Sequence, residues 1–474
     1  MELARLREQN RWWDSPDALG TDFHLKAVAA TPFPINHPVE KMINLAQDRL
    51  YILRGPRQVG KTTILKKLIK NLITSDGADP RSIFYFAFDV AGLRNATEVK
   101  DAVISYINWA RSLPVQRDRL WILLDEVTYT PDWAVGIKAA YDLGLLQGCT
   151  LLTTGSSAID LRRGGERLPG RRGLFADQND IDVLPVSFRS LLSCLYPAVS
   201  IQLVEQISPE DIFNKAKTAS YYQNEIQSAF KKYLLSGGYP LSIIDLAKKE
   251  EITQGTFFTY QQAMLGDMTR AGKNEAVLRE LIGGILTKNA EPITWQILQQ
   301  TTGIGSHNTV EDYVRTLEAL FVLSLLHQVR YLGGSEISFR KRKKIYFTDP
   351  FQYHCLCAWS SGYGNYFDFA DKTVTDPLRV SRLLEGVVAA HLMRHFPKLA
   401  FWRNRTEIDF ICLGNGKTEM FAELKYQTRI TSDDKRGLKK TKGGLLLTRD
   451  HLQIDQTNHI YMVPVHLFLA VLPE

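Results

Sequence analysis

The sequence predicts an α/β protein with a parallel sheet in its first domain, a helix-rich middle and a second α/β domain at the C-terminus. Three features predict it: a glycine-rich loop between a strand and a helix, an apolar strand that ends in two carboxylates, and two acid-bearing strands after residue 400. At 474 residues the chain is too long for one ordinary core, so we expect several domains.

Composition and charge set broad limits on the kind of protein. The chain is 45% hydrophobic and 23% charged, as soluble globular proteins are. It has no run of about 18 apolar residues, and its charged first residues do not resemble a signal peptide. Five cysteines give no disulfide framework, and their odd number fits a reducing compartment. We therefore expect a cytoplasmic protein without a membrane partner, and a net charge of +7 weakly favours a polyanionic partner.

The glycine-rich loop lies between a short buried strand, residues 51–54, and a helix over residues 63–72. It fits the phosphate-loop pattern G-x-x-x-x-G-K-[ST] at every fixed position, with the sequence Gly55-Pro56-Arg57-Gln58-Val59-Gly60-Lys61-Thr62. Glycines let the backbone N–H groups converge on phosphates, and the helix N-terminus adds positive potential. We therefore expect this loop and Thr63 to bind ATP, with Lys61 on the β- and γ-phosphates and the Thr62 hydroxyl on Mg²⁺.

A continuous apolar strand over residues 119–124 ends in Asp125 and Glu126. Strands that are buried on both faces of a parallel sheet have this composition, and ligands bind at their carboxyl ends. We expect Asp125 to hold the Mg²⁺ shell and Glu126 to polarise the attacking water as the base of ATP hydrolysis.

A third strand, residues 150–154, ends in Gly155-Ser156-Ser157, so Thr154 or Ser156 is the candidate sensor of the γ-phosphate. Past it, Arg171 lies in the basic segment of residues 168–173. An arginine there would stabilise transition-state charge, from the same subunit or from a neighbour in a homo-oligomer. An ordinary basic surface loop is the open alternative.

Several motifs together resemble a known family. Residues 55–195, with Thr154–Ser157, Leu168–Arg171 and Leu184–Arg189, are similar to AAA-type ATPases of archaea and bacteria, in the pairing of AAA_14 with DUF4143. Five later segments of the chain also resemble motifs of that family: Tyr233–Pro240, Lys344–Pro350, Phe401–Asn404, Glu407–Phe410 and Ala422–Tyr426. The resemblance implies an AAA-type P-loop parallel sheet with a helical lid, fused to a C-terminal domain of uncertain role.

The middle of the chain predicts a winged helix. A helix with Trp295 and Leu298, a turn at residues 303–305 and a helix over residues 307–320 form a helix-turn-helix pattern, followed by two β-rich segments joined at Gly333-Gly334. This wing carries Arg340-Lys341-Arg342-Lys343-Lys344, a candidate for contacts with DNA phosphates. The alternative is a structural spacer or partner platform whose basic run is a solvated strand edge.

The last part of the chain carries acids in a pattern typical of nucleases. Glu385 lies on a predicted helix, Asp409 shares a strand face with Glu407, and Glu423 shares one with Lys425 on the next strand. This resembles the D…(D/E)-x-K pattern of restriction-type nucleases. We expect Asp409, Glu423 and Glu385 to bind Mg²⁺ and Lys425 to be the catalytic cation of phosphodiester hydrolysis. A nuclease-like fold that has lost activity, or an unrelated α/β domain, would give the same pattern.

We therefore expect five segments. They are an N-terminal helical extension (1–37), an AAA-type ATPase core (38–199), a helical lid and connector (200–275), a winged helix-turn-helix (276–355) and a restriction-endonuclease-like PD-(D/E)XK α/β domain (356–474). The predicted function is an ATP-hydrolysing, DNA-acting enzyme that couples the AAA-type motor to a Mg²⁺-dependent deoxyribonuclease. The alternative is an ATP-driven switch or scaffold that binds DNA or a protein partner through a catalytically silent nuclease-like domain.

Overall fold

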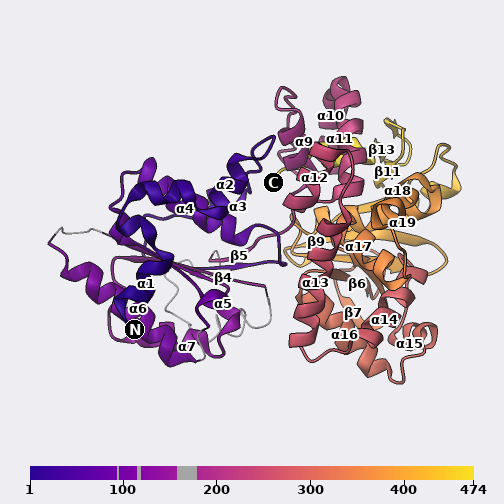
Figure 1. Ribbon diagram of the computed structural model, residues 1–474. Coiled ribbons are helices and arrows are strands. Elements are labelled where there is room, and N and C mark those ends of the chain that lie inside the picture. The colour runs from indigo at the N-terminus through magenta and orange to yellow at the C-terminus, as the bar shows by residue number, and fades with distance from the viewer. Residues whose placement is uncertain (93–94, 115–118, 157–178) are drawn as a thin grey trace. The chain divides into compact units, whose positions relative to one another are not determined.

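The structure, a computed structural model, describes residues 1–92, 95–114, 119–156 and 179–474 (Figure 1). The chain divides into two compact units, residues 1–184 and 185–474, and each contains its own β-sheet. None of the helices in the described ranges has the length and apolar character needed to cross a membrane.

The N-terminal unit contains a parallel sheet of five strands in the order β2-β3-β4-β1-β5. Its strands are β1 (Leu50–Arg54), β2 (Ile83–Ala87), β3 (Leu120–Asp125), β4 (Cys149–Gly155) and β5 (Asp180–Asp182). Arg54 pairs with Gly155, and Ala87 pairs with Asp125, at the carboxyl ends of their strands. The predicted ATP-site residues therefore lie along one edge of this sheet, where open parallel sheets bind ligands.

Helices cover both faces of the parallel sheet, with α4 (Lys61–Thr74) on one side and α6 (Ala96–Ser112) and α7 (Trp133–Asp142) on the other (Figure 1). The buried positions of α4 include Ile64, Leu65, Leu68, Ile69 and Leu72, the spacing of an amphipathic helix. Shorter elements complete the unit: α1 (Leu3–Gln9), η1 (Arg11–Trp13), η2 (Pro16–Thr21), α2 (Phe23–Ala29), α3 (Val39–Met42), η3 (Pro80–Ser82), α5 (Phe88–Ala91) and η4 (Val127–Tyr129).

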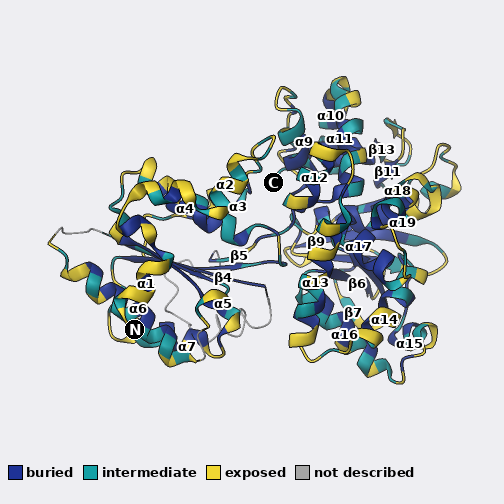
Figure 2. Ribbon diagram, in the orientation of Figure 1, coloured by how far each residue is buried: buried dark blue, intermediate teal, exposed yellow. Residues whose placement is uncertain are grey.

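The C-terminal unit contains a mixed sheet of eight strands in the order β12-β13-β11-β10-β9-β8-β6-β7. Its strands are β6 (Leu323–Val329), β7 (Ile337–Phe347), β8 (Lys398–Arg403), β9 (Glu407–Gly414), β10 (Lys417–Lys425), β11 (Gly444–Thr448), β12 (Gln453–Asp455) and β13 (Ile460–Pro464). β8, β9 and β10 form an antiparallel meander, and β11 then pairs with β10 in parallel. The strands of both sheets are largely buried (Figure 2).

The helices of this unit lie before, between and after these strands. They are α9 (Phe188–Leu195), α10 (Pro209–Ala219), α11 (Gln223–Ser236), α12 (Pro240–Lys249), α13 (Gln254–Arg270), α14 (Glu275–Thr287), α15 (Trp295–Thr302), α16 (His307–Ala319), α17 (Pro350–Ser360), α18 (Tyr366–Thr375), α19 (Pro377–Leu392), α20 (Arg436–Lys440) and α21 (Val465–Val471). The two helices of the predicted helix-turn-helix are α15 and α16, and Gly303, with φ of 72°, ends the first of them.

The hairpin predicted as a wing does not form a sheet of its own. β6 and β7 pair with each other, but β6 also pairs with β8, where Gln328 lies opposite Phe401. A cluster of buried side chains continues across these strands, from Val329 on β6 to Leu446 on β11. Helix α17 runs across the boundary expected between residues 355 and 356. The hairpin therefore belongs to the same sheet as the acid-bearing strands.

Candidate functional site

The predicted phosphate loop connects β1 to α4 at the carboxyl edge of the parallel sheet. α4 begins directly after Gly60, whose φ of 104° is a backbone conformation that favours glycine. Gly55 has no room for a side chain, because a Cβ there would lie 2.1 Å from the carbonyl oxygen of Val183. The two glycines let the loop turn tightly into the helix, whose first N–H groups are donors for an anion.

Lys61 lies inside this loop and is 4% exposed. Its Nζ donates hydrogen bonds to the carbonyl oxygens of Gly55 at 2.9 Å and Pro56 at 2.8 Å, and it lies 3.8 Å from Glu126 Oε1. These contacts hold the ammonium group over the loop, next to the backbone N–H groups that would bind phosphate oxygens.

Asp125, the last residue of β3, is held by hydroxyl groups from both neighbouring strands. Oδ1 accepts a hydrogen bond from Thr154 on β4, and Oδ2 accepts one from Tyr85 on β2 at 2.9 Å. The Thr154 oxygen in turn accepts a hydrogen bond from the N–H of Glu126 at 3.0 Å. The strand order β2-β3-β4 thus fixes the orientation of the carboxylate that was predicted to hold Mg²⁺.

Glu126 lies directly after Asp125, with Oε1 3.8 Å from Lys61 Nζ. Its φ of 51° lies in the left-handed region, and its Oε2 is buried without a hydrogen-bond partner among the described residues. Burial raises the pKa of this carboxyl, and Lys61 partly opposes the rise. A tight glycine cradle, a buried lysine and an unsatisfied carboxylate oxygen together fit Mg²⁺–ATP, with Thr62 and Asp125 as the residues that would hold the metal.

Of the two candidate sensors, Thr154 is the one whose hydroxyl contacts Asp125, while Ser156 is buried just past the end of β4. Arg171 lies outside the described residues.

Tyr85 was not predicted as a site residue. The available signal was a hydroxyl-bearing side chain in the otherwise apolar strand β2, which lies next to the strand that ends in Asp125.

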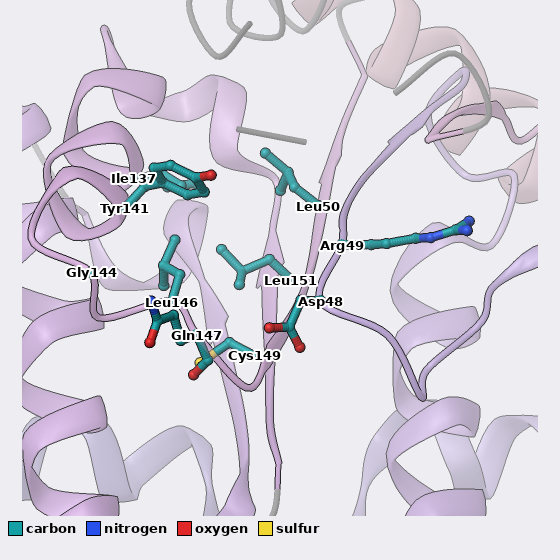
Figure 3. A pocket seen from close by; sticks show the side chains of 10 residues that line it. All are labelled: Asp48, Arg49, Leu50, Ile137, Tyr141, Gly144, Leu146, Gln147, Cys149 and Leu151. Carbon is teal, nitrogen blue, oxygen red and sulfur yellow. The ribbon is translucent and has the colours of Figure 1, made fainter. Parts of the chain in front are cut away.

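A separate cavity of about 350 Å³ lies at the opposite, amino edge of the same sheet (Figure 3). Leu50 and Leu151 line it near the starts of β1 and β4, Tyr141 lines it from α7, and the Arg49 side chain points away from the others. Because the phosphate loop follows the other end of β1, this cavity is not part of the nucleotide site.

Two of the three predicted metal ligands of the C-terminal unit, Glu385 and Asp409, lie against a buried lysine, Lys344 of β7, and so does Glu407. The Nζ of Lys344 lies 2.7 Å from Glu407 Oε1, 2.9 Å from Asp409 Oδ1 and 3.3 Å from Glu385 Oε2. Tyr346 donates a hydrogen bond to the same Glu385 oxygen at 2.9 Å. Because Lys344 is only 1% exposed, these carboxylates replace water in compensating its charge.

Burial and these ion pairs set the pKa values in the cluster. Burial alone would lower the pKa of Lys344, but Asp409 and Glu385 hold it well above its ordinary value. Burial would raise the pKa of Asp409, yet Lys344 and Lys425 bring it down to about 2. Burial raises the pKa of Glu385 to about 7, with Lys344 opposing the rise. Lys344 and Asp409 are therefore an ionised pair at neutral pH.

Glu423 and Lys425 lie on β10, beside the Asp409 strand. The N–H of Leu424 donates a hydrogen bond to Asp409 Oδ2 at 3.1 Å. Glu423 is 3% exposed, its Oε2 lies 4.0 Å from Lys425 Nζ, and its Oε1 has no hydrogen-bond partner in the described part of the chain. Burial raises the pKa of Glu423 to about 8, so this carboxyl is largely protonated at neutral pH.

The predicted metal set of Glu385, Asp409 and Glu423 does not fit Mg²⁺ in this arrangement. Within the described ranges, no group of three or more His, Cys, Asp or Glu side chains is placed to hold a metal ion. A divalent ion bound to Glu385 and Asp409 would meet the ammonium of Lys344, which already contacts both. In the sequence, Lys344 belongs to the basic run that predicts an exposed wing, and nothing in that run indicates its position among the acids.

Only part of that basic run is exposed. Arg340, Lys341 and Arg342 are exposed, whereas Lys343 and Lys344 are 3% and 1% exposed. The Lys343 ammonium lies 4.0 Å from the centre of the Trp295 ring. The prediction that all five residues contact DNA phosphates is therefore wrong for the last two, because packing covers both faces of β7 at that point.

The chain matches three family models. Residues 47–192 match the AAA domain AAA_14, and residues 227–362 and 380–468 match the domains of unknown function DUF8612 and DUF4143. No curated protein matches the chain.

Among solved structures, the chain is similar to the Walker-type ATPase PABY2304 of Pyrococcus abyssi, with 12% identity, 65% of this chain and 90% of that chain covered, and a TM-score of 0.39. It is also similar to the ORC1 protein of Aeropyrum pernix in complex with DNA, with 12% identity, coverage of 74% and 96%, and a TM-score of 0.29.

The AAA-domain match includes the phosphate loop, the strand that ends in Asp125 with Glu126 directly after it, and the Thr154 strand. These elements carry the arrangement that the chemistry of nucleotide phosphates requires. Residues 47–192 are therefore an AAA-type P-loop ATPase domain.

Proposed function

We propose that this chain is an ATP-driven switch that binds DNA through its C-terminal unit without cleaving it. The observation that carries the proposal is the position of Lys344, whose ammonium lies within 3.3 Å of Glu385, Glu407 and Asp409. An internal ammonium group compensates these carboxylates, as a metal would in a nuclease. Unlike a metal, it does not lower the pKa of a bound water to make an attacking hydroxide.

The ATPase domain supplies the switch. The loop N–H groups and Lys61 would hold the phosphates, Thr62 and Asp125 would hold Mg²⁺, and Glu126 would orient and deprotonate the attacking water. Bound Mg²⁺ would neutralise charge that develops on the γ-phosphate. Loss of that phosphate changes the charge held by the loop. Such a local change in charge can shift the equilibrium between two conformations of a protein.

The exposed part of the β6–β7 hairpin supports DNA as the partner. Arg340, Lys341 and Arg342 can neutralise phosphates and release counterions. Tyr331 and Phe339, which are 59% and 67% exposed, lie on the same hairpin and are side chains of the kind that stack on bases.

Binding and cleavage assays with the full-length protein test this function. We expect ATP hydrolysis that responds to DNA, and no cleavage of supercoiled, linear or branched DNA in Mg²⁺ or Mn²⁺. The double variant Arg340→Glu/Arg342→Glu should bind DNA more weakly than wild type. Unchanged affinity in that variant would remove the hairpin as the DNA contact, and cleavage that disappears in Asp409→Asn would overturn the non-cleaving role.

A Mg²⁺-dependent deoxyribonuclease is the second candidate, and one observation favours it. Asp409 and Glu423 lie on the adjacent strands β9 and β10, with Lys425 two residues further on, as the D…(D/E)-x-K resemblance requires. For this activity Lys344 would have to leave the carboxylates so that a metal could enter. The same cleavage assay separates the two candidates.

A further inference from the structure

The edge strand β2 is hydrogen-bonded by side chains from the start of the chain. Asn10 Oδ1 accepts a hydrogen bond from the N–H of Tyr85 at 2.7 Å, and Asn10 Nδ2 donates to the Tyr85 carbonyl at 2.8 Å. Gln9 makes the equivalent pair with Ala87, at 2.7 and 3.4 Å. These two amide side chains offer the donor and acceptor that a neighbouring strand would offer, and so they cover an exposed sheet edge.

Two indole groups extend this contact along the strand. The Nε1 groups of Trp12 and Trp13 both donate to the carbonyl of Ile83, at 3.2 and 2.8 Å. Ile83, Tyr85 and Ala87 are alternate residues of β2. Side chains of residues 9–13 therefore bond all three of their carbonyl groups and the N–H groups of Tyr85 and Ala87.

Tyr85 connects this edge to the nucleotide site. Its backbone is held by Asn10, which is fully buried, and its hydroxyl donates to Asp125 Oδ2 at 2.9 Å. The ring is also fixed, because the ammonium of Lys66 lies 3.5 Å from its centre and 3.3 Å from Asp22 Oδ2. Residues of the first 22 therefore hold Tyr85 at its backbone and, through Lys66, at its ring.

We infer that Tyr85 is a positioning residue for Asp125, the carboxylate that would hold Mg²⁺, and that residues 9–22 keep Tyr85 in place. The inference rests on the proposed nucleotide site. The hydroxyl of Tyr85 orients one carboxylate oxygen while Thr154 orients the other. Without the Tyr85 hydroxyl, one buried oxygen of Asp125 loses its donor, and Thr154 alone orients the carboxylate.

Equilibrium binding of a fluorescent ATP analogue to the full-length protein, titrated with Mg²⁺, tests the inference. The variant is Tyr85→Phe, and the matched control is Tyr106→Phe. Tyr106 is buried as Tyr85 is, its hydroxyl donates to the Arg81 carbonyl at 3.3 Å, and its ring stacks on Trp13. The control therefore removes one buried hydroxyl from the same core.

We expect all three proteins to bind the analogue alike without Mg²⁺. Tyr85→Phe should then need about tenfold more Mg²⁺ than wild type to reach half of its gain in affinity, the loss expected for one hydrogen bond to a charged group. Tyr106→Phe should follow wild type. Equal Mg²⁺ midpoints for the two variants would overturn the positioning role. If instead Lys61→Ala binds the analogue as wild type does, the nucleotide site itself is wrong.

The contribution of the first residues is tested by Asn10→Ala in the same titration. We expect a shift in the Mg²⁺ midpoint in the same direction as in Tyr85→Phe, and no further shift when the two changes are combined, because they act through the same hydrogen-bonded path. Additive shifts, or no shift in Asn10→Ala, would show that residues 9–22 do not act through Tyr85.

Discussion

The two units each bury a lysine near carboxylates, and the two lysines have different surroundings. In the N-terminal unit, Lys61 donates to two backbone carbonyls of the phosphate loop, and hydroxyls of Thr154 and Tyr85 hold Asp125. In the C-terminal unit, Lys344 itself pairs with three carboxylates within 3.3 Å.

This difference distinguishes a carboxylate that can bind a metal ion from carboxylates whose charge a lysine already neutralises. A carboxylate that is oriented by hydroxyl groups keeps its negative charge and can attract a metal. A carboxylate that is paired with a buried ammonium has that charge compensated already, and separating the pair is costly. Buried acids near a lysine can therefore have opposite roles, depending on which group faces each carboxylate.

The largest effect that we expect follows from removing Lys344. Lys344→Met leaves Glu385, Glu407 and Asp409 without their cation, and the free energy of unfolding should fall by about 3–5 kcal/mol. Urea denaturation measures this, with Lys343→Met as the control, because Lys343 is equally buried but lies against the Trp295 ring. Equal losses in the two variants would mean that the carboxylates do not depend on Lys344.

The next largest effect concerns the other lysine. Lys61→Ala removes the cation of the phosphate loop and should slow ATP hydrolysis by about a hundredfold or more, with little change in stability. Steady-state ATPase rates measure this, and the control is Lys67→Ala, a lysine of the same helix that pairs with Glu40. Hydrolysis at the wild-type rate in Lys61→Ala would contradict the assignment of the loop.

A smaller effect depends on pH and comes from Glu423. Its pKa is about 8 in the folded protein, against an ordinary value of 4.5, so between these values the folded chain keeps a proton that the unfolded chain has lost. The free energy of unfolding should therefore fall as the pH rises from about 5 to 8. Glu423→Gln removes this titration, and the fall should become shallower by up to about 1.4 kcal/mol per pH unit.

Urea denaturation at several pH values measures that slope. Glu419→Gln is the control, since Glu419 lies exposed on the same strand. If the slope is the same in wild type, Glu423→Gln and Glu419→Gln, the buried carboxyl is not the protonated group described above.

The smallest effect concerns the hairpin. Arg342→Gln should reduce the slope of the logarithm of the DNA-binding constant against the logarithm of salt concentration by about 1, the value for one lost phosphate contact. Lys343→Gln should leave that slope unchanged, because Lys343 is buried. Binding curves at several salt concentrations measure the slope. A larger change for Lys343→Gln than for Arg342→Gln would contradict the division of the basic run.

The nucleotide site was largely predictable from the sequence, because eight consecutive residues between a strand and a helix carry most of its chemistry. Asp125 and Thr154 were found for the same reason, since each lies at the end of a recognisable apolar strand. Tyr85 could not be assigned, because its contact with Asp125 depends on which strands are neighbours in the sheet. That order is a property of the whole fold.

The acids of the C-terminal unit were also predictable from strand alternation, but their partner was not. Lys344 lies 65 residues before Asp409 and reaches it only in the folded sheet. Consecutive residues of a strand point to opposite faces, so Lys343 and Lys344 are both buried only because both faces of β7 are covered there. A run of five basic residues gives no sign of this covering, and it is most simply interpreted as exposed.

Counting bound Mn²⁺ by electron paramagnetic resonance, with and without ATP, tests most directly the contrast between the two lysines. We expect one Mn²⁺ per chain with ATP, lost in Lys61→Ala, and none without nucleotide, because Lys344 already compensates the C-terminal carboxylates. A nucleotide-independent Mn²⁺ that disappears in Asp409→Asn would contradict this account and place a metal where we place the ammonium of Lys344.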